Sequence, residues 1–309
     1  MNPGPENSKT GLMQTYRIPF HAMACTCEVV IAAMDEQATM SMVRDAIAEV
    51  KRIELKYSRY RSDSIVSRIN GEAGGKATEC DEETCALLDY AQVLYGSSES
   101  LFDITAGILR RAWDFKSTRI PSAQELANLC RLIGWDKVER KDNTLRLPQA
   151  GMEIDFGGFG KEYAADRAAA ILQAAGGSHG YVNLGGDIRV LGPKPDQEPW
   201  IIGIQDPRQP GKIIASIPVR EGALATSGDY EKYFEVDGQR YCHILNPHTG
   251  MPVRYWRSVS VLAALTSMAG SCTTIAMLKE EAGLDYLDAA GVRYLAIDAE
   301  GAVHTQVRS

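Results

Sequence analysis

The chain has 309 residues, of which 45% are hydrophobic and 24% are charged, and its formal net charge at pH 7 is −7. This length and composition allow a large buried core, so we expect a globular protein of one large domain or two small ones. The acidic balance leaves no broad cationic face for nucleic acid. Because no run approaches the ~20 apolar residues of a membrane span, we also expect no membrane insertion.

The seven cysteines form neither a C-x-x-C pair nor a zinc-ribbon spacing, and their odd number argues against a fully paired disulfide framework. We therefore expect reduced thiols and a cytoplasmic protein. Residues 1–12 are polar and rich in Gly, Pro and Asn, which predicts a disordered leader or tag before a domain that covers residues 13–309.

Apolar residues at helical spacing predict several helices. One of them opens with a Ser122–Glu125 capping box and is closed by Gly134. The expected helices cover residues 35–60, 83–98, 122–134 and 162–172, and another begins near residue 268.

Alternating or β-branched segments bounded by turn residues predict the strands. Hairpins are expected at Asp142–Asn143 and at Asp237–Gly238. The strand segments are residues 27–32, 137–148, 152–158, 179–192, 200–207, 213–228, 231–245, 258–265 and 294–305. Helices and strands mix without a regular βαβ repeat, which favours one intertwined α+β domain with mixed or antiparallel sheets and packed helices.

A glycine-rich turn and a lysine stand before the alanine-rich helix in DFGGFGKEYAADRAAAIL, residues 155–172. Glycines allow a ligand to approach the backbone, and a helix N-terminus together with Lys161 favours an anion such as phosphate. Glu162 follows the lysine where a Walker A motif requires Ser or Thr, so an ordinary strand-to-helix turn is the alternative. His243 lies in a strand pattern and is either a structural histidine or a general base.

Seven stretches carry a resemblance that covers the chain from about Met23 to its C-terminus. They are MACTCEV, YSRYRSDSIVSRIN, LFDITAGILRRAWDF, IDFGGFGKEYAAD, YVNLGGDIRVLG, LATSGDYEKYF and YCHILNPHTGMPV. In this order they resemble the motifs of FAD:protein FMN transferases, the ApbE family. The resemblance implies an α+β flavin-transferase fold. It also implies a magnesium-dependent, metal-binding enzyme that cleaves the diphosphate of FAD, releases AMP and joins FMN to a threonine of an acceptor flavoprotein, a reaction called flavinylation.

The same resemblance implies roles for single residues. Lys161 and His243 would be catalytic. The residues expected to bind FAD are Met23, Tyr60, Leu101, Phe102, Asp103, Asp155, Lys161 and Leu245.

The metal site is where the sequence departs from the family pattern. Mg²⁺ would be held by the Gly158 carbonyl and the Thr274 hydroxyl, with Thr273 beside it. The family's metal-binding Asp is replaced by Gly270, and Glu162 stands where the family has glycine. Two alternatives to transfer therefore stay open: a flavin-binding carrier, scaffold or regulator that has lost transfer, and an FAD diphosphatase that gives FMN and AMP.

Overall fold

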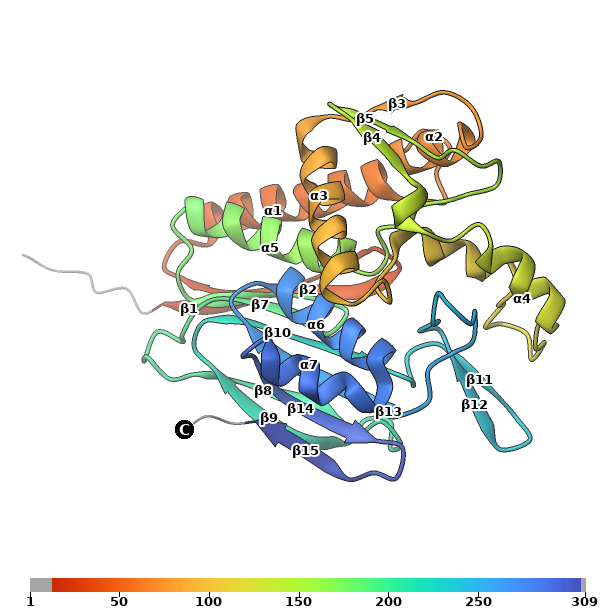
Figure 1. Ribbon diagram of the computed structural model, residues 1–309. Coiled ribbons are helices and arrows are strands. Elements are labelled where there is room, and N and C mark those ends of the chain that lie inside the picture. Colours follow the sequence, from red (N-terminus) through yellow and green to blue (C-terminus); the bar gives the residue numbers. More distant parts are fainter. Residues whose placement is uncertain (1–12, 307–309) are drawn as a thin grey trace, which may run out of the picture.

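The computed structural model describes residues 13–306, and the proposed leader at 1–12 lies outside this range. Within it, an eight-stranded antiparallel sheet has the order β1-β2-β6-β7-β10-β13-β14-β15 (Figure 1). Its strands are β1 (Gln14–Ala22), β2 (Cys25–Ala33), β6 (Gly180–Leu184), β7 (Asp187–Gly192), β10 (Gly222–Gly228), β13 (Trp256–Ala263), β14 (Arg293–Asp298) and β15 (Val303–Gln306).

Helices and three small sheets surround the central sheet. The helices are α1 (Glu36–Tyr57), α2 (Ile65–Gly71), α3 (Glu82–Ser97), α4 (Ala123–Cys130), α5 (Gly160–Ala174), α6 (Thr266–Lys279) and α7 (Gly283–Ala289), with 3₁₀ turns at Ile104–Arg111, Trp135–Lys137 and Glu280–Ala282. The small sheets contain β3 (Thr78–Glu79), β4 (Glu139–Lys141) and β5 (Thr144–Arg146), then β8 (Trp200–Gln205) and β9 (Ile213–Val219), and then β11 (Tyr233–Val236) and β12 (Gln239–Cys242).

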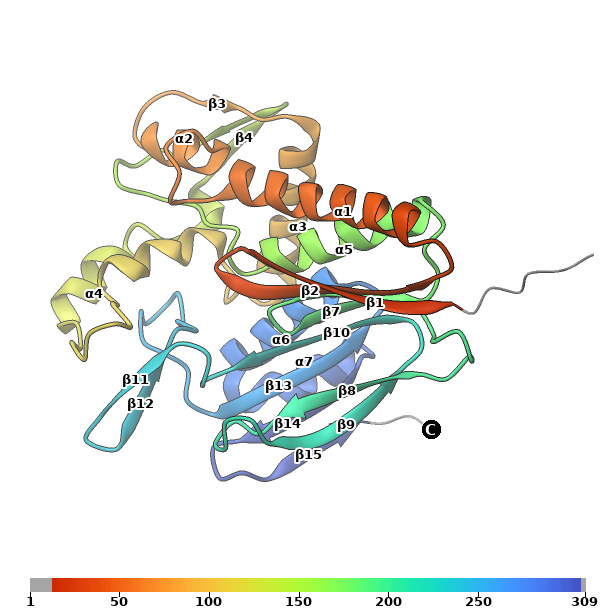
Figure 2. The same cartoon turned by 180° about the vertical axis from the view of Figure 1, so that it is seen from behind.

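The period-two pattern of the strands divides the core between the two faces of the sheet. In β2, Val29 and Ile31 pack with helices α1 and α5, whereas Val30 packs with the hairpin β8–β9 on the opposite face. Helices α6 and α7 cover the same face as α1 and α5, over β13 and β14 (Figures 1 and 2). The expected intertwined α+β domain is confirmed.

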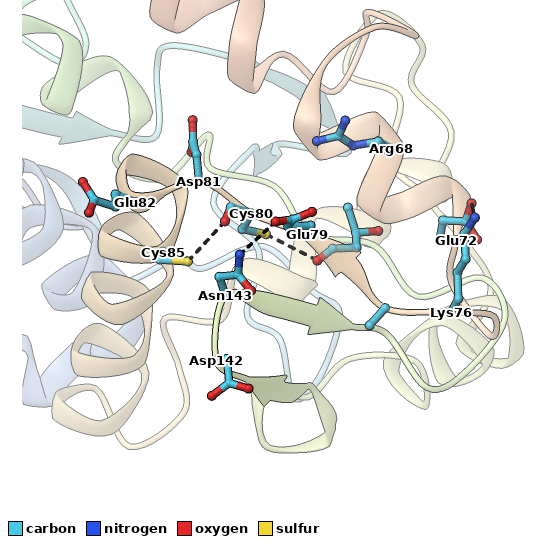
Figure 3. Close-up of a pocket in the computed structure, with 12 residues that line it drawn as sticks. Arg68, Glu72, Lys76, Glu79, Cys80, Asp81, Glu82, Cys85, Asp142 and Asn143 are labelled. Atoms are coloured by element: carbon cyan, nitrogen blue, oxygen red, sulfur yellow. Dashed lines mark hydrogen bonds and ion pairs between the residues drawn. The ribbon is translucent and has the colours of Figure 1, made fainter.

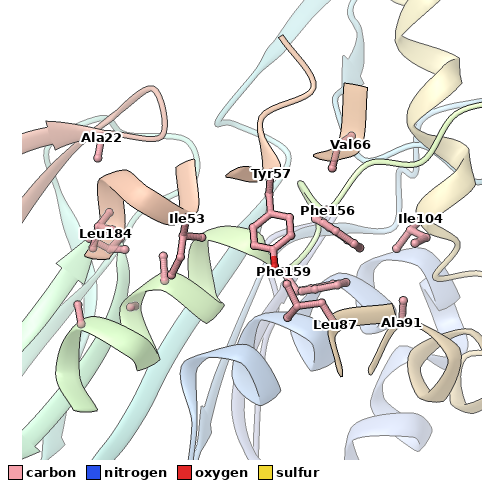
Figure 4. Packing of buried hydrophobic residues seen from close by; sticks show 14 of the residues in the cluster. Ala22, Ile53, Tyr57, Val66, Leu87, Ala91, Ile104, Phe156, Phe159 and Leu184 are labelled. Carbon is pink, nitrogen blue, oxygen red and sulfur yellow. The ribbon is translucent and has the colours of Figure 1, made fainter. Parts of the chain in front are cut away.

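An aromatic cluster holds the glycine turn that precedes α5. The rings of Phe156 and Phe159, which flank this turn, lie 5.4 Å apart, and Tyr57 of α1 meets Phe156 edge-on at 5.4 Å (Figure 4). Phe102 stacks on Phe159 at 6.3 Å. All four rings are buried, so the turn is anchored on both sides by hydrophobic packing.

The expected strand at residues 152–158 is wrong. Residues 152–156 belong to no strand, residues 157–158 lie in a turn, and the backbone bonds of Ile154 and Asp155 go to a side chain of α2 and to the 3₁₀ turn at Ile104. The Asn70 side-chain amide donates to the Ile154 carbonyl at 3.0 Å and accepts the backbone N–H of Ile154 at 2.7 Å. The Asp155 N–H donates to the Ile104 carbonyl at 2.8 Å. Tertiary partners that no local pattern shows have replaced the neighbouring strand.

Turn chemistry was predicted better than helix ends. Asp142 and the pair Asp237–Gly238 adopt left-handed φ angles in hairpins β4–β5 and β11–β12, as expected. Ser122 accepts the Glu125 N–H at the start of α4. The expected closure of this helix at Gly134 is wrong, however, because α4 ends at Cys130 and tight 3₁₀-type turns follow.

Two further expectations concern the thiols and the membrane. All seven cysteines, which lie within the described part of the chain, are free. Among residues 13–306, no helix is both long and apolar enough to cross a membrane.

Helix α6 lacks an N-cap of its own, and Asp166 of α5 takes that role. Its carboxylate accepts the N–H groups of Thr266 and Ser267 at 2.8 and 2.9 Å. Replacing Asp166 with Ala should lower the free energy of unfolding by about 1–2 kcal/mol, because these helix-end donors lose their acceptor. Urea unfolding measures this loss, and Asp166→Asn, which keeps one acceptor oxygen, should lose less. An unchanged midpoint in the Ala variant would show that the cap contributes nothing.

Candidate functional site

The glycine turn brings backbone close to neighbouring side chains at the start of α5. A Cβ atom on Gly158 would lie 2.7 Å from Cζ of Phe102, which is closer than real Cβ atoms come. Phe102 is only 5% exposed and cannot retreat into solvent. Position 158 therefore requires glycine, and the predicted site residues Phe102 and Gly158 lie in direct contact.

Lys161, on the first turn of α5, forms an ion pair with Asp187 at the start of β7. Lys161 Nζ lies 2.7 Å from Oδ2 of Asp187, whose side chain is 4% exposed. Burial lowers the pKa of Lys161, but the charges of Asp187 and Glu162 outweigh burial and raise it overall. The ammonium group therefore stays charged at neutral pH, next to the glycine turn.

The turn between β1 and β2 reaches the same place. Met23 and Ala24 both have left-handed φ angles there, and the Met23 N–H donates to Glu54 Oε1 at 2.6 Å. The Cys25 and Cys27 thiols that follow are 3.6 Å apart. The hydrogen bond from Cys27, followed by the charge of Lys161, lowers the pKa of the Cys25 thiol to about 7, although burial opposes this.

A cluster of hydroxyl groups connects β10 with α6. Ser227 Oγ lies 2.8 Å from Thr273 Oγ1 and 3.3 Å from Thr274 Oγ1. Thr273 also donates to the Gly270 carbonyl at 2.8 Å, as hydroxyls in helices often do. Thr273 is therefore fully engaged, whereas the Thr274 hydroxyl has a single long contact.

Glu162 is buried against α6. Its side chain packs on Gly270, and its Oε2 atom has no hydrogen-bond partner. Burial, followed by the charge of Asp187, raises the pKa of this carboxyl to about 8, while Lys161 opposes the rise. Glu162 and Gly270, the two positions expected to depart from the family pattern, therefore lie in contact.

Two arginines organise the far side of the turn. Arg59 pairs with Asp155 at 3.1 Å and with Glu153 at 2.6 Å. Asp155 also accepts the Gly157 N–H at 2.9 Å. The Tyr60 hydroxyl accepts from Arg110 at 3.2 Å, but the Tyr60 ring is 80% exposed. Asp155 is therefore fixed by protein contacts, while the Tyr60 ring is open to a ligand.

Asp103 has a structural role that the sequence did not indicate. It caps the 3₁₀ turn at Ile104–Arg111 and accepts the Thr105 N–H and hydroxyl, both at 2.7 Å, and the Trp135 N–H at 3.0 Å. Burial raises its pKa although these bonds oppose the rise. A carboxylate accepts about four hydrogen bonds, so a single position remains for a ligand.

His243 is not in a strand, contrary to expectation, because β12 ends at Cys242. The backbone N–H of His243 donates to the Lys232 carbonyl at 3.0 Å. In the side chain, the buried ring atom Nδ1 has no hydrogen-bond partner. Burial, followed by the charges of Arg110 and Lys232, lowers its pKa to about 4, and Lys161 contributes in the same direction. The neutral ring therefore lies in a cationic environment that includes Lys161.

Of the predicted residues, Phe102, Asp155, Gly158 and Lys161 lie at the glycine turn or on the first turn of α5. Leu245 follows His243 and forms an isolated bridge with Pro252, while Leu101 packs at the edge of the core under α6. No sequence pattern indicated a role for Arg110, Ser227 or the pairing of Lys161 with Asp187. Arg110 and Ser227 lie within recognised motifs, but only three-dimensional contacts reveal what they do.

A cavity of about 890 Å³ lies elsewhere, beside α2, β3 and the β4–β5 turn (Figure 3). Charged residues such as Arg68, Glu79 and Asp142 line it, and none of the predicted site residues does. The described residues also contain no cluster of three or more His, Cys, Asp or Glu side chains arranged for a metal. A metal at the candidate site would therefore need hydroxyl, carbonyl or ligand oxygens in addition.

Comparisons with known proteins identify the family of this chain. The chain matches the ApbE family over residues 23–296. It is 31% identical over 257 residues to the FAD:protein FMN transferase of Vibrio cholerae serotype O1, covering 80% of this chain and 76% of that protein. It is 30% identical over 263 residues to the FAD:protein FMN transferase of Treponema pallidum, covering 76% and 73% of the two chains.

Solved structures show the same fold. The ApbE protein of Thermotoga maritima MSB8 superimposes with a TM-score of 0.87 and 32% identity, over 95% of this chain and 97% of that one. The flavin transferase ApbE of Vibrio cholerae gives a TM-score of 0.85 and 26% identity over the same shares. By its sequence and its fold, this chain belongs to the ApbE family.

Proposed function

We propose that this protein is an FAD:protein FMN transferase. It would cleave the diphosphate of FAD, attach FMN to a threonine of an acceptor protein and release AMP. The observation that carries the proposal is the charged Lys161 on the first turn of α5, directly after the glycine turn. Backbone N–H groups, the helix N-terminus and an ammonium group together favour a diphosphate. The curated relatives carry the same activity in their names.

FAD would lie along the residues gathered around this turn. Lys161 would neutralise diphosphate oxygens, and the exposed Tyr60 ring and the Met23 side chain would contact the ring systems. Phe102, Asp103, Asp155, Leu101 and Leu245 complete the proposed FAD-binding set. The seven free thiols are consistent with a reducing, cytoplasmic environment.

Mg²⁺ is proposed as the metal. The available donors fit a hard cation, since the Gly158 carbonyl, the Thr274 hydroxyl with Thr273 beside it, and the unpartnered oxygen of Glu162 are all oxygen atoms. When bound, the cation would offset negative charge on the diphosphate. The chain's own contribution is to hold Lys161 charged and to position the acceptor hydroxyl.

One incubation tests the proposed reaction. The protein is mixed with FAD, Mg²⁺ and a threonine-containing acceptor peptide, and mass spectrometry is expected to show the peptide carrying one FMN together with free AMP. Free FMN and AMP beside an unmodified peptide would instead identify an FAD diphosphatase. Bound FAD that remains intact would identify a flavin-binding protein without transfer activity.

FAD should bind more tightly than FMN, because the proposed contacts extend over both halves of the dinucleotide. Lys161→Gln should weaken FAD binding about 10-fold or more, since it removes a charge-assisted contact. Quenching of flavin fluorescence measures both affinities. Lys212→Gln, at an exposed position of the β8–β9 hairpin, serves as the control. Equal affinities for FMN and FAD would mean that the adenosine half has no site.

His243 is proposed to orient or deprotonate the acceptor hydroxyl. Its pKa of about 4 keeps the imidazole neutral at pH 7, so its nitrogen can accept a hydrogen bond or a proton. His243→Ala should leave FAD affinity unchanged and slow transfer by about 100- to 10,000-fold. Single-turnover transfer at saturating FAD separates the two effects. A variant that transfers at the parent rate would return His243 to a structural role.

A further inference from the structure

Glu162 is a buried acid without a complete set of partners. It lies on the first turn of α5, is 8% exposed, and leaves Oε2 without any hydrogen-bond partner. A buried polar or charged atom without a hydrogen-bond partner destabilises the fold unless a ligand, an ion or a water molecule binds it. The neighbouring acids are already engaged, since Asp187 pairs with Lys161 and Asp166 caps α6.

Gly270 creates the space that Glu162 fills. A Cβ atom on Gly270 would lie 2.6 Å from Cγ and 2.7 Å from Oε1 of Glu162. Glycine within a helix costs about 1 kcal/mol relative to alanine, so its presence inside α6 calls for a packing reason. The overlap supplies that reason: any side chain at position 270 would displace the Glu162 carboxyl group.

The Glu162 carboxyl group packs on the face of α6 that carries Gly270. Residues four apart on a helix share a face, so Gly270 and Thr274 present the same side of α6. Thr274 has the less engaged hydroxyl of the Ser227 cluster, and Lys161 adjoins Glu162 in the chain. The Glu162 carboxyl group therefore lies on the face of α6 that carries Thr274, and Lys161 is close enough for its charge to act on that carboxyl group.

We propose that Glu162 is the carboxylate ligand of a divalent cation that binds together with the diphosphate. Gly270, which has no side chain, leaves the space that the Glu162 carboxyl group occupies. The carboxylate would come from α5 instead of α6. This inference rests on the proposed function, because it takes a diphosphate as the shared ligand. Mg²⁺ commonly uses one or two carboxylates together with phosphate oxygens, so a cluster of three acids is unnecessary.

The test uses ADP, which carries a diphosphate but cannot donate FMN. Calorimetric titration of ADP, with and without Mg²⁺, gives the factor by which the cation tightens binding. We expect a factor of about 10 or more for the parent protein, within the usual range of coupling between two ligands. Glu162→Gln should reduce the factor to about 2 or less. Glu221→Gln, an exposed acid at the opposite end of β10 from Ser227, should keep the parent value.

Exchange variants address folding. Gly270→Asp alone should lower the melting temperature, because its side chain overlaps Glu162. Glu162→Gly alone should remain folded but lose the Mg²⁺ effect on ADP. The double variant Glu162→Gly with Gly270→Asp should recover both properties, so the two changes are strongly non-additive.

The outcomes separate the two proposals. If Mg²⁺ does not tighten ADP binding to the parent, or tightens it equally in the folded Glu162→Gln variant, the ligand assignment is overturned. If the effect depends on Glu162 but no FMN reaches the acceptor peptide, the assignment stands and the proposed transfer reaction falls.

Discussion

The carboxylate of Asp166 fastens helix α5 to helix α6, one turn after the residues of the candidate site. Asp166 accepts two N–H groups at the start of α6 and lies 3.5 Å from Arg189 of β7. One side chain therefore joins both helices to the central sheet. Lys161 and Glu162 lie one turn earlier on α5, so this contact helps to fix the helix that carries them.

Lys161 is a half-buried cation on the first turn of α5, and its partner Asp187 is buried. Lys161 keeps its charge because Asp187 lies 2.7 Å away, and the same charge contributes to the neutral state of His243. A buried ion pair that loses one partner is strongly destabilised. An anionic ligand must therefore approach Lys161 without fully displacing Asp187, which favours binding to the open side of the ammonium group.

Local features of the sequence predicted local features of the structure. The hairpins at Asp142 and Asp237–Gly238 follow from turn residues alone, and motif order was enough to place Lys161 at a glycine turn. The strand expected at residues 152–158 failed because its hydrogen-bond partners lie far away in the sequence. Residues 152–158 bond to Asn70, and Glu162 faces Gly270 on another helix. No periodicity or propensity records such contacts, so the sequence could not show that Gly270 and Glu162 lie against each other.

The segment that leads into the glycine turn is held by side chains, and this sets its local stability apart from that of the sheet. Asn70 and Arg59 fix Ile154 and Asp155, whereas the strands of the sheet share continuous ladders. Opening the segment would leave the ladders intact, but it would expose the buried side chains of Ile154 and Phe156 to water. The segment therefore owes its position to hydrophobic packing and to partners far away in the sequence, which ties the glycine turn to α2 and to the 3₁₀ turn that begins at Ile104.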